Sequence, residues 1–96
     1  MTSKEACIFS ERLSYWINSG VKGSALYARL SSDPALPPSF SPEAVSEITG
    51  LSLAAIKKRR NRRIGPDYIR ISHKTIAYPR AAICAWLANQ YVSEAA

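Results

Sequence analysis

The chain has 96 residues, 47% of them hydrophobic, and carries 13 Lys and Arg against 7 Asp and Glu, for a net charge of +6. This length suits one small globular domain and leaves no room for a second full one. No apolar run approaches the roughly 18 residues that span a bilayer, and Met1 to Lys4 lack the basic-then-apolar order of a secretory signal. We therefore expect a cytoplasmic, nucleoid-associated protein with no membrane partner.

Catalytic and metal-binding functions find little support. Cys7 and Cys84 form no C-x-x-C or Cys/His spacing, which argues against a zinc site and a disulfide framework, so two buried thiols are expected. The chain has one histidine, no G-x-S-x-G motif, no Gly-rich phosphate loop and dispersed acidic residues. We expect no enzyme, no cofactor and no metal.

Residues 1–33 are expected to form an N-terminal helical hairpin. One amphipathic helix is indicated by apolar residues at helical spacing, namely Phe9, Leu13, Trp16 and Ile17. Gly20 ends it, and a second short helix can begin with Ser24 as its cap and end before Asp33-Pro34. Three prolines in residues 34–39 then indicate a stiff connector, which is the best candidate boundary in the chain.

Residues 40–92 are expected to form the second unit, which begins with two short helices. Ser41-Pro42-Glu43 is a strong helix start, because the Ser hydroxyl caps free N–H groups and Pro and Glu suit the first turn. Gly50 ends this helix, and Ser52 caps a second one that runs through Ile56 into a basic segment. Two short helices joined by a tight Gly-containing turn form a helix-turn-helix pattern.

A β-hairpin and a final helix are expected to follow. Tyr68–Ile71 and Thr75–Tyr78 alternate apolar and polar residues around the turn at Ser72-His73-Lys74. Pro79 opens the last helix, and Trp86 is assigned to packing because it shares a face with Ile83 and Leu87. The predicted fold class is mainly α with a small β-hairpin, a winged helix-turn-helix preceded by the N-terminal helical hairpin.

The net charge belongs to one short stretch. Six of the seven residues from Lys57 to Arg63 are basic, and the rest of the chain is balanced at 7 against 7. Charge this concentrated creates a local field that favours a nucleic-acid partner. A solvated basic face without a partner and a nuclear localisation signal are the alternatives.

Several strings between Phe40 and Leu87 strengthen this interpretation: Phe40-Ser41-Pro42-Glu43-Ala44-Val45, Gly50-Leu51-Ser52, Gly65-Pro66, Tyr78-Pro79-Arg80 and Ala85-Trp86-Leu87. Together they resemble the excisionase-like and AlpA-like DNA-binding proteins of phages and mobile elements, which are relatives of the MerR-type DNA-binding domain. The resemblance implies that the second helix enters the major groove while the wing touches backbone or minor groove. The chain departs from the pattern of these proteins at three positions. Ser46 stands where they usually carry a small apolar residue, and Leu53 and Ala54 stand where polar residues are common, at the start of the helix that enters the major groove.

The expected DNA contacts fall into three groups. Lys57, Arg60 and Asn61 share a helical face suited to reading bases, and the contacts expected to hold the phosphates are Lys58, Arg59, Arg62 and Arg63. Ser52 and Ala54, at the start of the same helix, are further candidates. In the wing and the last helix, the candidates are Arg70, His73, Lys74, Thr75 and Arg80.

We therefore expect a sequence-specific double-stranded DNA-binding protein, a transcriptional regulator or an excisionase-like architectural factor of a phage, plasmid or other mobile element. One such module buries little surface, so a homodimer or cooperative oligomer on DNA is expected. The candidate dimer surface is apolar and comprises Leu13, Trp16, Ile17, Leu26 and Leu30; the alternative is that this face folds back onto the winged core. The rival functions are a protein-interaction adaptor whose N-terminal helices recruit a recombinase or replication protein, and an RNA-binding arginine-rich helix.

Overall fold

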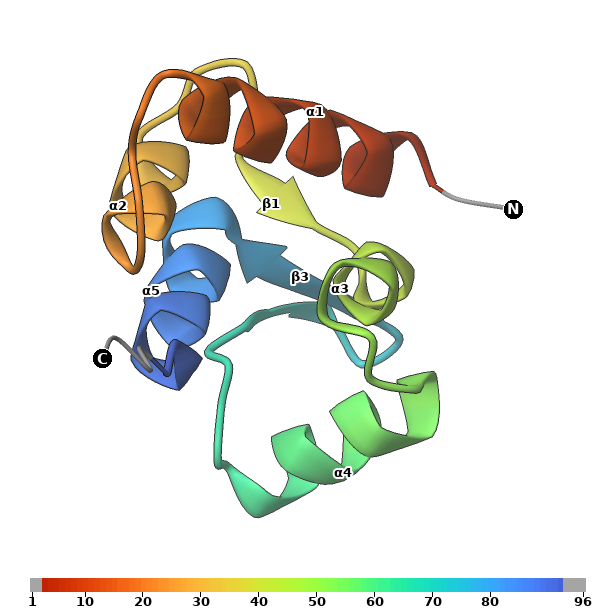
Figure 1. Cartoon of the computed structure of the whole chain (residues 1–96). Helices are drawn as coiled ribbons and strands as arrows, with labels where there is room; N and C mark the ends of the chain where they lie inside the picture. The colour runs from red at the N-terminus through yellow and green to blue at the C-terminus, as the bar shows by residue number, and fades with distance from the viewer. Residues whose placement is uncertain (1–2, 93–96) are drawn as a thin grey trace.

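The computed structural model describes residues 3–92, which form helices around a small antiparallel sheet (Figure 1). In chain order, the elements are α1 (Lys4–Asn18), α2 (Ala25–Ser31), β1 (Ser39–Phe40), α3 (Pro42–Thr49), α4 (Leu53–Arg62), β2 (Ile69–Ser72), β3 (Thr75–Pro79) and α5 (Arg80–Gln90). The mainly helical class with a small β-hairpin is therefore confirmed.

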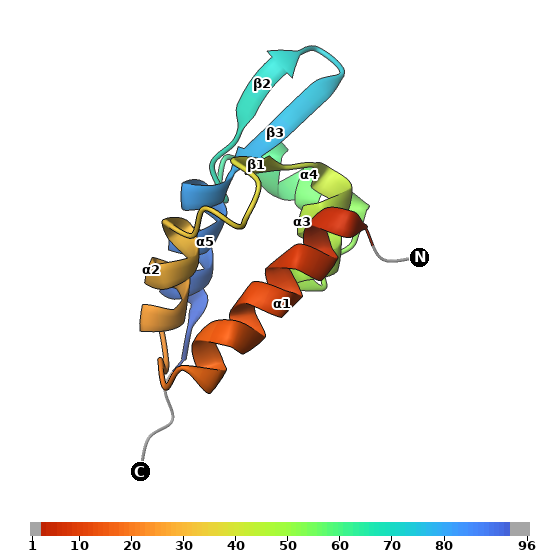
Figure 2. The ribbon, with the colours of Figure 1, turned by 90° about the horizontal axis from the view of Figure 1, so that it is seen from above.

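The sheet has the strand order β1-β3-β2, with both pairings antiparallel. The short strand β1 pairs with the end of β3, placing Phe40 opposite Tyr78. Strands β2 and β3 form the expected hairpin, which projects beyond the helices (Figure 2). Strand β1 was not predicted, because a segment of two residues shows no periodicity of its own.

The helix starts follow from local sequence. The Oγ atoms of Ser3, Ser41 and Ser52 accept hydrogen bonds from the main-chain N–H three residues on, at 3.1, 3.2 and 3.0 Å. Each bond satisfies one of the N–H groups that a first helical turn leaves free. Ser24 occupies the corresponding position in α2, but its side chain makes no capping bond.

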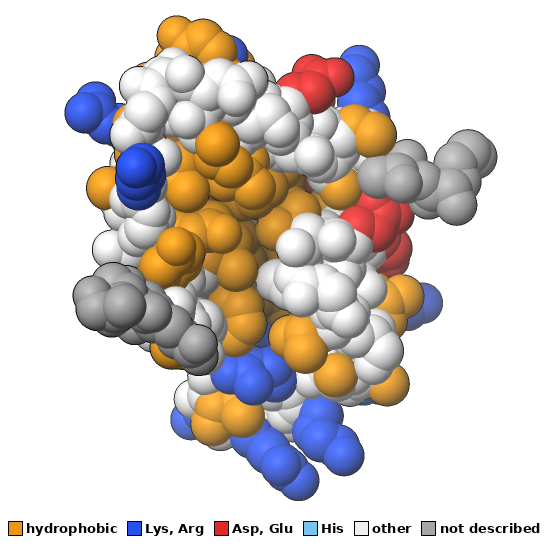
Figure 3. Space-filling view, viewed as in Figure 1, with side chains coloured by type: hydrophobic (Ala, Val, Ile, Leu, Met, Phe, Trp, Pro, Cys, Tyr) orange, Lys and Arg blue, Asp and Glu red, His pale blue; other side chains and the backbone are white. Residues whose placement is uncertain are grey.

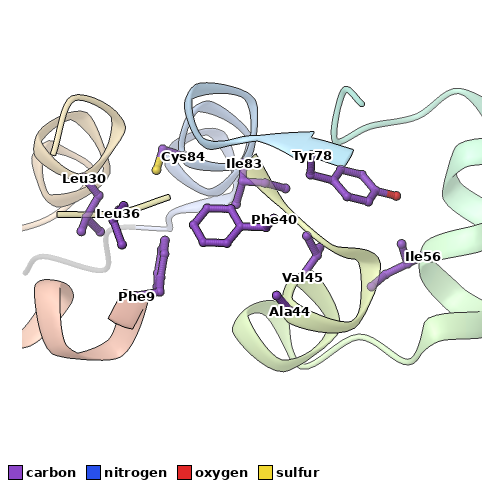
Figure 4. Close-up of a cluster of buried hydrophobic side chains, with 10 residues drawn as sticks. All are labelled: Phe9, Leu30, Leu36, Phe40, Ala44, Val45, Ile56, Tyr78, Ile83 and Cys84. Atoms are coloured by element: carbon purple, nitrogen blue, oxygen red, sulfur yellow. The ribbon is translucent and has the colours of Figure 1, made fainter. Parts of the chain in front are cut away.

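A single buried core joins the N-terminal helices to the rest of the molecule (Figure 4). Phe9 of α1 meets Phe40 of β1 edge to face, with ring centroids 6.0 Å apart. Leu30 of α2 and Leu36 of the segment that follows it lie in the same cluster as Ile83. The proline-rich segment 34–39 thus packs into the core and does not behave as a spacer between two units.

The expected dimer surface is largely buried within the chain's own fold. Leu30 is fully buried and Leu26 nearly so, and Leu13 and Trp16 pack against the core as partly buried side chains. Ile17 alone of the five remains half exposed. The folded-back alternative therefore holds for Leu26 and Leu30 and in part for Leu13 and Trp16, because α2 packs along α5 and α1 packs on α3.

An apolar hollow of about 500 Å³ lies between α1, α2, α3 and α5 and forms the orange centre of Figure 3. Its lining includes Leu13, Tyr27, Ile48 and Leu87.

Asp33 is the polar centre of the N-terminal half. Its buried carboxylate accepts hydrogen bonds from Arg12 Nε at 2.7 Å, Trp16 Nε1 at 2.9 Å and the main-chain N–H of Ala35 at 2.9 Å. Burial alone would raise the pKa of Asp33, but the bonds from Arg12, Ala35 and Trp16 outweigh it and lower that pKa.

We predict that Asp33→Asn lowers the free energy of unfolding at neutral pH by about 2 to 3 kcal/mol, because it removes a charge-assisted bond and places an amide N–H₂ among donors. A lowered folded-state pKa stabilises the native state above the unfolded pKa of about 3.9, and this contribution disappears as pH falls through the folded value. Urea unfolding followed by tryptophan fluorescence should thus show the gap between variant and wild type closing below about pH 4. An exposed-carboxylate control, Glu11→Gln, should show almost no change at neutral pH, and a gap for Asp33→Asn that persists in acid would contradict this account.

The two thiols differ, in contrast to the expectation that both are buried. Cys84 is buried in the core, and Cys7 is exposed on α1. Burial raises the pKa of Cys84 to about 11, which suppresses the reactive thiolate.

We predict that a chromogenic disulfide reagent at about pH 8 labels one thiol in the native protein and a second only after denaturation. Cys7→Ser should abolish the native reaction and leave the denatured one. Rapid native labelling of the Cys7→Ser variant would show that Cys84 is accessible.

Candidate nucleic-acid interface

The turn between α3 and α4 is fixed by hydrogen bonds on both sides. Gly50 takes the left-handed conformation with φ +80°, and its N–H donates to the carbonyl of Ser46. The hydroxyl of Ser46 donates to the carbonyl of Leu51 at 2.6 Å, and Thr49 Oγ1 accepts from the N–H of Leu51 at 3.2 Å. Ser46, at which the resemblance implied a small apolar residue, thus provides a bond that holds the corner.

The basic segment lies on an ordered helix, as expected. Helix α4 has ten residues, and Ile56 is its one buried side chain. Lys and Arg side chains gather around α4 at the lower edge of the molecule (Figure 3). Figure 1 shows this helix at the margin of the fold, on the side away from α1.

The outward face of α4 differs from the expected one. Ala54, Lys57, Lys58, Asn61 and Arg62 are exposed, while Arg59 and Arg60 are partly buried. Positions three and four beyond Ile56 fall on its side of the helix, so Arg59 and Arg60 turn toward the protein. The assignment of Arg60 to base reading on the outward face therefore does not agree with the geometry, and Arg59 does not share that face with Lys58 and Arg62.

Arg59 fastens α4 to the loop that follows it. Its Nε donates to the carbonyl of Gly65 at 2.8 Å and its Nη2 to the carbonyl of Ile64 at 3.3 Å. The guanidinium also lies over the ring of Trp86 in α5, 5.1 Å from the ring centre. This cation-π contact agrees with the packing role expected for Trp86 and adds a partner that was not anticipated.

Arg60 fastens α4 to the sheet. Its Nη1 donates to the hydroxyl of Tyr78 at 3.0 Å, and the side chain of Tyr78 is fully buried in β3. The buried hydroxyl needs a partner, so the bond stabilises both side chains. The spacing of these arginines from Ile56 was the signal in the sequence that indicated their direction.

Loop 64–68 passes close to α5. Gly65 has φ +81°, and a Cβ atom there would lie 3.3 Å from Cδ1 of Trp86, so glycine is needed both for the backbone and for the close approach. Arg63 ends α4 in the left-handed region, with φ 56° and an exposed side chain.

The hairpin candidates all lie in the projecting β2–β3 unit. Arg70, His73, Lys74 and Thr75 are exposed there, close to or within the turn that joins the two strands (Figure 2). The guanidinium of Arg70 lies 5.9 Å from the ring centre of Tyr68. Exposed basic groups at the end of a projecting hairpin are positioned to meet a phosphate.

Arg80 is separate from this group. Its Nε donates to the carbonyl of Ser31 at 3.0 Å, and its Nη1 donates to the carbonyls of Asp33 and Leu36 at 2.9 and 3.0 Å. These acceptors lie at and just beyond the C-terminal end of α2, where carbonyl groups lack helical partners. The expected phosphate contact is therefore replaced by an intramolecular one, and Arg80 is not part of the candidate interface.

The described residues also bear on metal binding and on membrane crossing. No group of three or more His, Cys, Asp or Glu side chains in that part of the chain could hold a metal ion. Over the same residues, no helix combines the length and apolar character that crossing a bilayer requires.

Comparison of the chain with protein-family models, with curated proteins and with solved structures finds no match.

We predict that Arg59→Gln lowers the free energy of unfolding by about 1 to 2 kcal/mol, because it removes a cation-π contact and weakens two bonds to loop carbonyls. Arg62→Gln is the matched control on the same helix, and its effect should stay within about 0.5 kcal/mol. Both changes remove one positive charge from the cluster, so relief of repulsion contributes similarly to each. Equal effects of the two variants in urea unfolding would show that the Arg59 contacts contribute nothing.

Proposed function

We propose that this protein binds double-stranded DNA sequence-specifically as a winged helix-turn-helix, with α4 in the major groove and the β2–β3 hairpin as the wing. The observation that carries the proposal is the exposed side of α4, where positive charge lies on a rigid helix held by a fixed turn. A helix of this kind matches the width of the major groove, about 12 Å. Transcriptional regulation or architectural assistance to excision in a phage, plasmid or other mobile element is the role that we infer.

The contacts are distributed by exposure. Lys57 and Asn61 are the candidates for base reading, because amine and amide donors meet the acceptor atoms of guanine and adenine in the major groove. Lys58 and Arg62 lie at the other side of the exposed face and suit the flanking phosphates. The exposed hairpin residues add contacts to an adjoining stretch of backbone.

The expected dimer surface receives less support, and the adaptor function stays the alternative hypothesis. The dimer surface depended on an apolar face of the N-terminal helices, and Leu26 and Leu30 of that face fill the protein's own core. A homodimer or cooperative oligomer on DNA stays part of the proposal, formed through other surfaces. Experiments must use the full chain, since residues 3–38 contribute Phe9, Leu30 and Leu36 to the core.

We predict that the affinity for duplex DNA falls steeply with salt. With about 4 to 8 phosphate contacts, log K against log salt should have a slope near −0.9 per contact. Fluorescence anisotropy with a labelled duplex measures it, and structured RNA serves as competitor to test the RNA alternative. A flat salt response, or preference for the RNA, would rule the proposal out.

Two variants distinguish a contact to a base from a contact to a phosphate. Once fragments selected from random duplexes define the site, Asn61→Ala should relax preference at one base pair by about 1 to 3 kcal/mol. Arg62→Gln should weaken all sequences alike and reduce the salt slope by about 1. The assignment fails if the two variants change the selected sequences in the same way.

A further inference from the structure

A second feature of the basic region lies behind α4, on the side turned toward the protein. A hollow of about 380 Å³ separates the C-terminal half of α4 from the loop that leads to β2. Figure 1 shows this loop running back from the end of α4. The lining comprises Arg59, Arg60, Arg63, Gly65, Pro66, Asp67 and Tyr68.

The three arginines retain free hydrogen-bond donors. A guanidinium has five N–H groups, and Arg59 uses its Nε and Nη2 for loop carbonyls while Arg60 uses its Nη1 for Tyr78. None of the three forms an ion pair: within residues 3–92, the ion pair that the structure contains joins Arg12 to Asp33 in the N-terminal half. Asp67 lines the hollow without forming an ion pair there.

Two of these guanidiniums are already fixed before any ligand arrives. The bonds to Gly65 and Tyr78 and the contact with Trp86 hold Arg59 and Arg60 in place, so binding immobilises little further side-chain freedom. The three guanidinium groups around this open space also repel one another. A bound anion would be attracted to each of them, and this attraction would offset their mutual repulsion. Planar guanidinium forks match the oxygen atoms of a phosphate.

We propose that this hollow is a phosphate-binding site formed by Arg59, Arg60 and Arg63. The site as such stands on its own geometry, and its assignment to a phosphate of the DNA backbone rests on the proposed function. A free phosphate compound shares the same chemistry. Asp67 weakens the site, because its carboxylate repels the anion.

Titration of the full-length, isotope-labelled protein with inorganic phosphate, at constant ionic strength in chloride, tests the site by NMR. Saturable shifts should concentrate on the amides of Ile64, Gly65, Asp67 and Tyr68. Arg63→Asn should weaken phosphate binding about 10-fold, because a charge-assisted bond is lost, and Asn accepts the left-handed backbone at that position. Asp67→Asn should tighten binding about 3-fold, and Lys22→Gln, which removes an exposed positive charge elsewhere, should leave it unchanged.

Adding duplex DNA to the phosphate-loaded protein identifies the source of the phosphate. Loss of the phosphate-specific shifts, together with tighter DNA binding by Asp67→Asn, supports a backbone phosphate in the hollow. Simultaneous binding of phosphate and duplex supports a free phosphate compound as the ligand.

The two proposals fail separately. Phosphate shifts that are absent, or spread evenly over exposed lysines and arginines, would overturn the site even if duplex binding kept its steep salt dependence. Saturable shifts in a protein that does not bind duplex would support the site and refute DNA binding.

Discussion

The position of α4 depends on one buried side chain and two inward-turned arginines. Ile56 alone among its residues is buried, and full burial of such a side chain contributes about 1.5 to 3 kcal/mol. That contact fixes the distance of the helix from the core but leaves rotation about its axis and tilt at its C-terminal end. Arg59 and Arg60 remove these freedoms by bonding to the loop at residues 64–65 and to Tyr78 of β3. The direction of every outward side chain on α4 follows from these contacts.

This arrangement divides the basic cluster between two roles. Lys57, Lys58 and Arg62 face solvent, and Arg59 and Arg60 hold the helix while keeping their charge. Positive charge used as a structural bond still contributes to the electrostatic potential at the surface. A cluster of like charges that would repel one another on an isolated helix is tolerated here because carbonyls and a hydroxyl accept N–H groups of Arg59 and Arg60, and an indole ring lies against the guanidinium of Arg59.

Local patterns in the sequence predicted the elements well. The caps at Ser41 and Ser52, the turn at Gly50 and the hairpin at residues 69–79 depend on neighbours in the chain, so their signals are complete within a short window. The cap predicted at Ser24 makes no capping hydrogen bond. The directions of Arg59 and Arg60 were also available from their spacing to Ile56, but the density of charge suggested a single outward face. Arg80 could not be placed in this way, because its acceptors at Ser31, Asp33 and Leu36 are 44 to 49 residues distant in sequence.

The N-terminal helices show most clearly how long-range packing decides between two readings of one pattern. Their apolar stripes were equally compatible with a surface that pairs with a second copy and with a face that packs onto the chain's own core. Amphipathic periodicity shows that one face of a helix is buried, but it does not show which part of which molecule buries it. Asp33 favours the second arrangement physically. Its carboxylate binds Arg12 and Trp16 of α1, and its carbonyl accepts from Arg80 of α5, so one residue joins three parts of the fold. Helices fixed in this way cannot swing out to pair with a twin, so cooperative binding of copies on DNA would have to use surfaces outside this core.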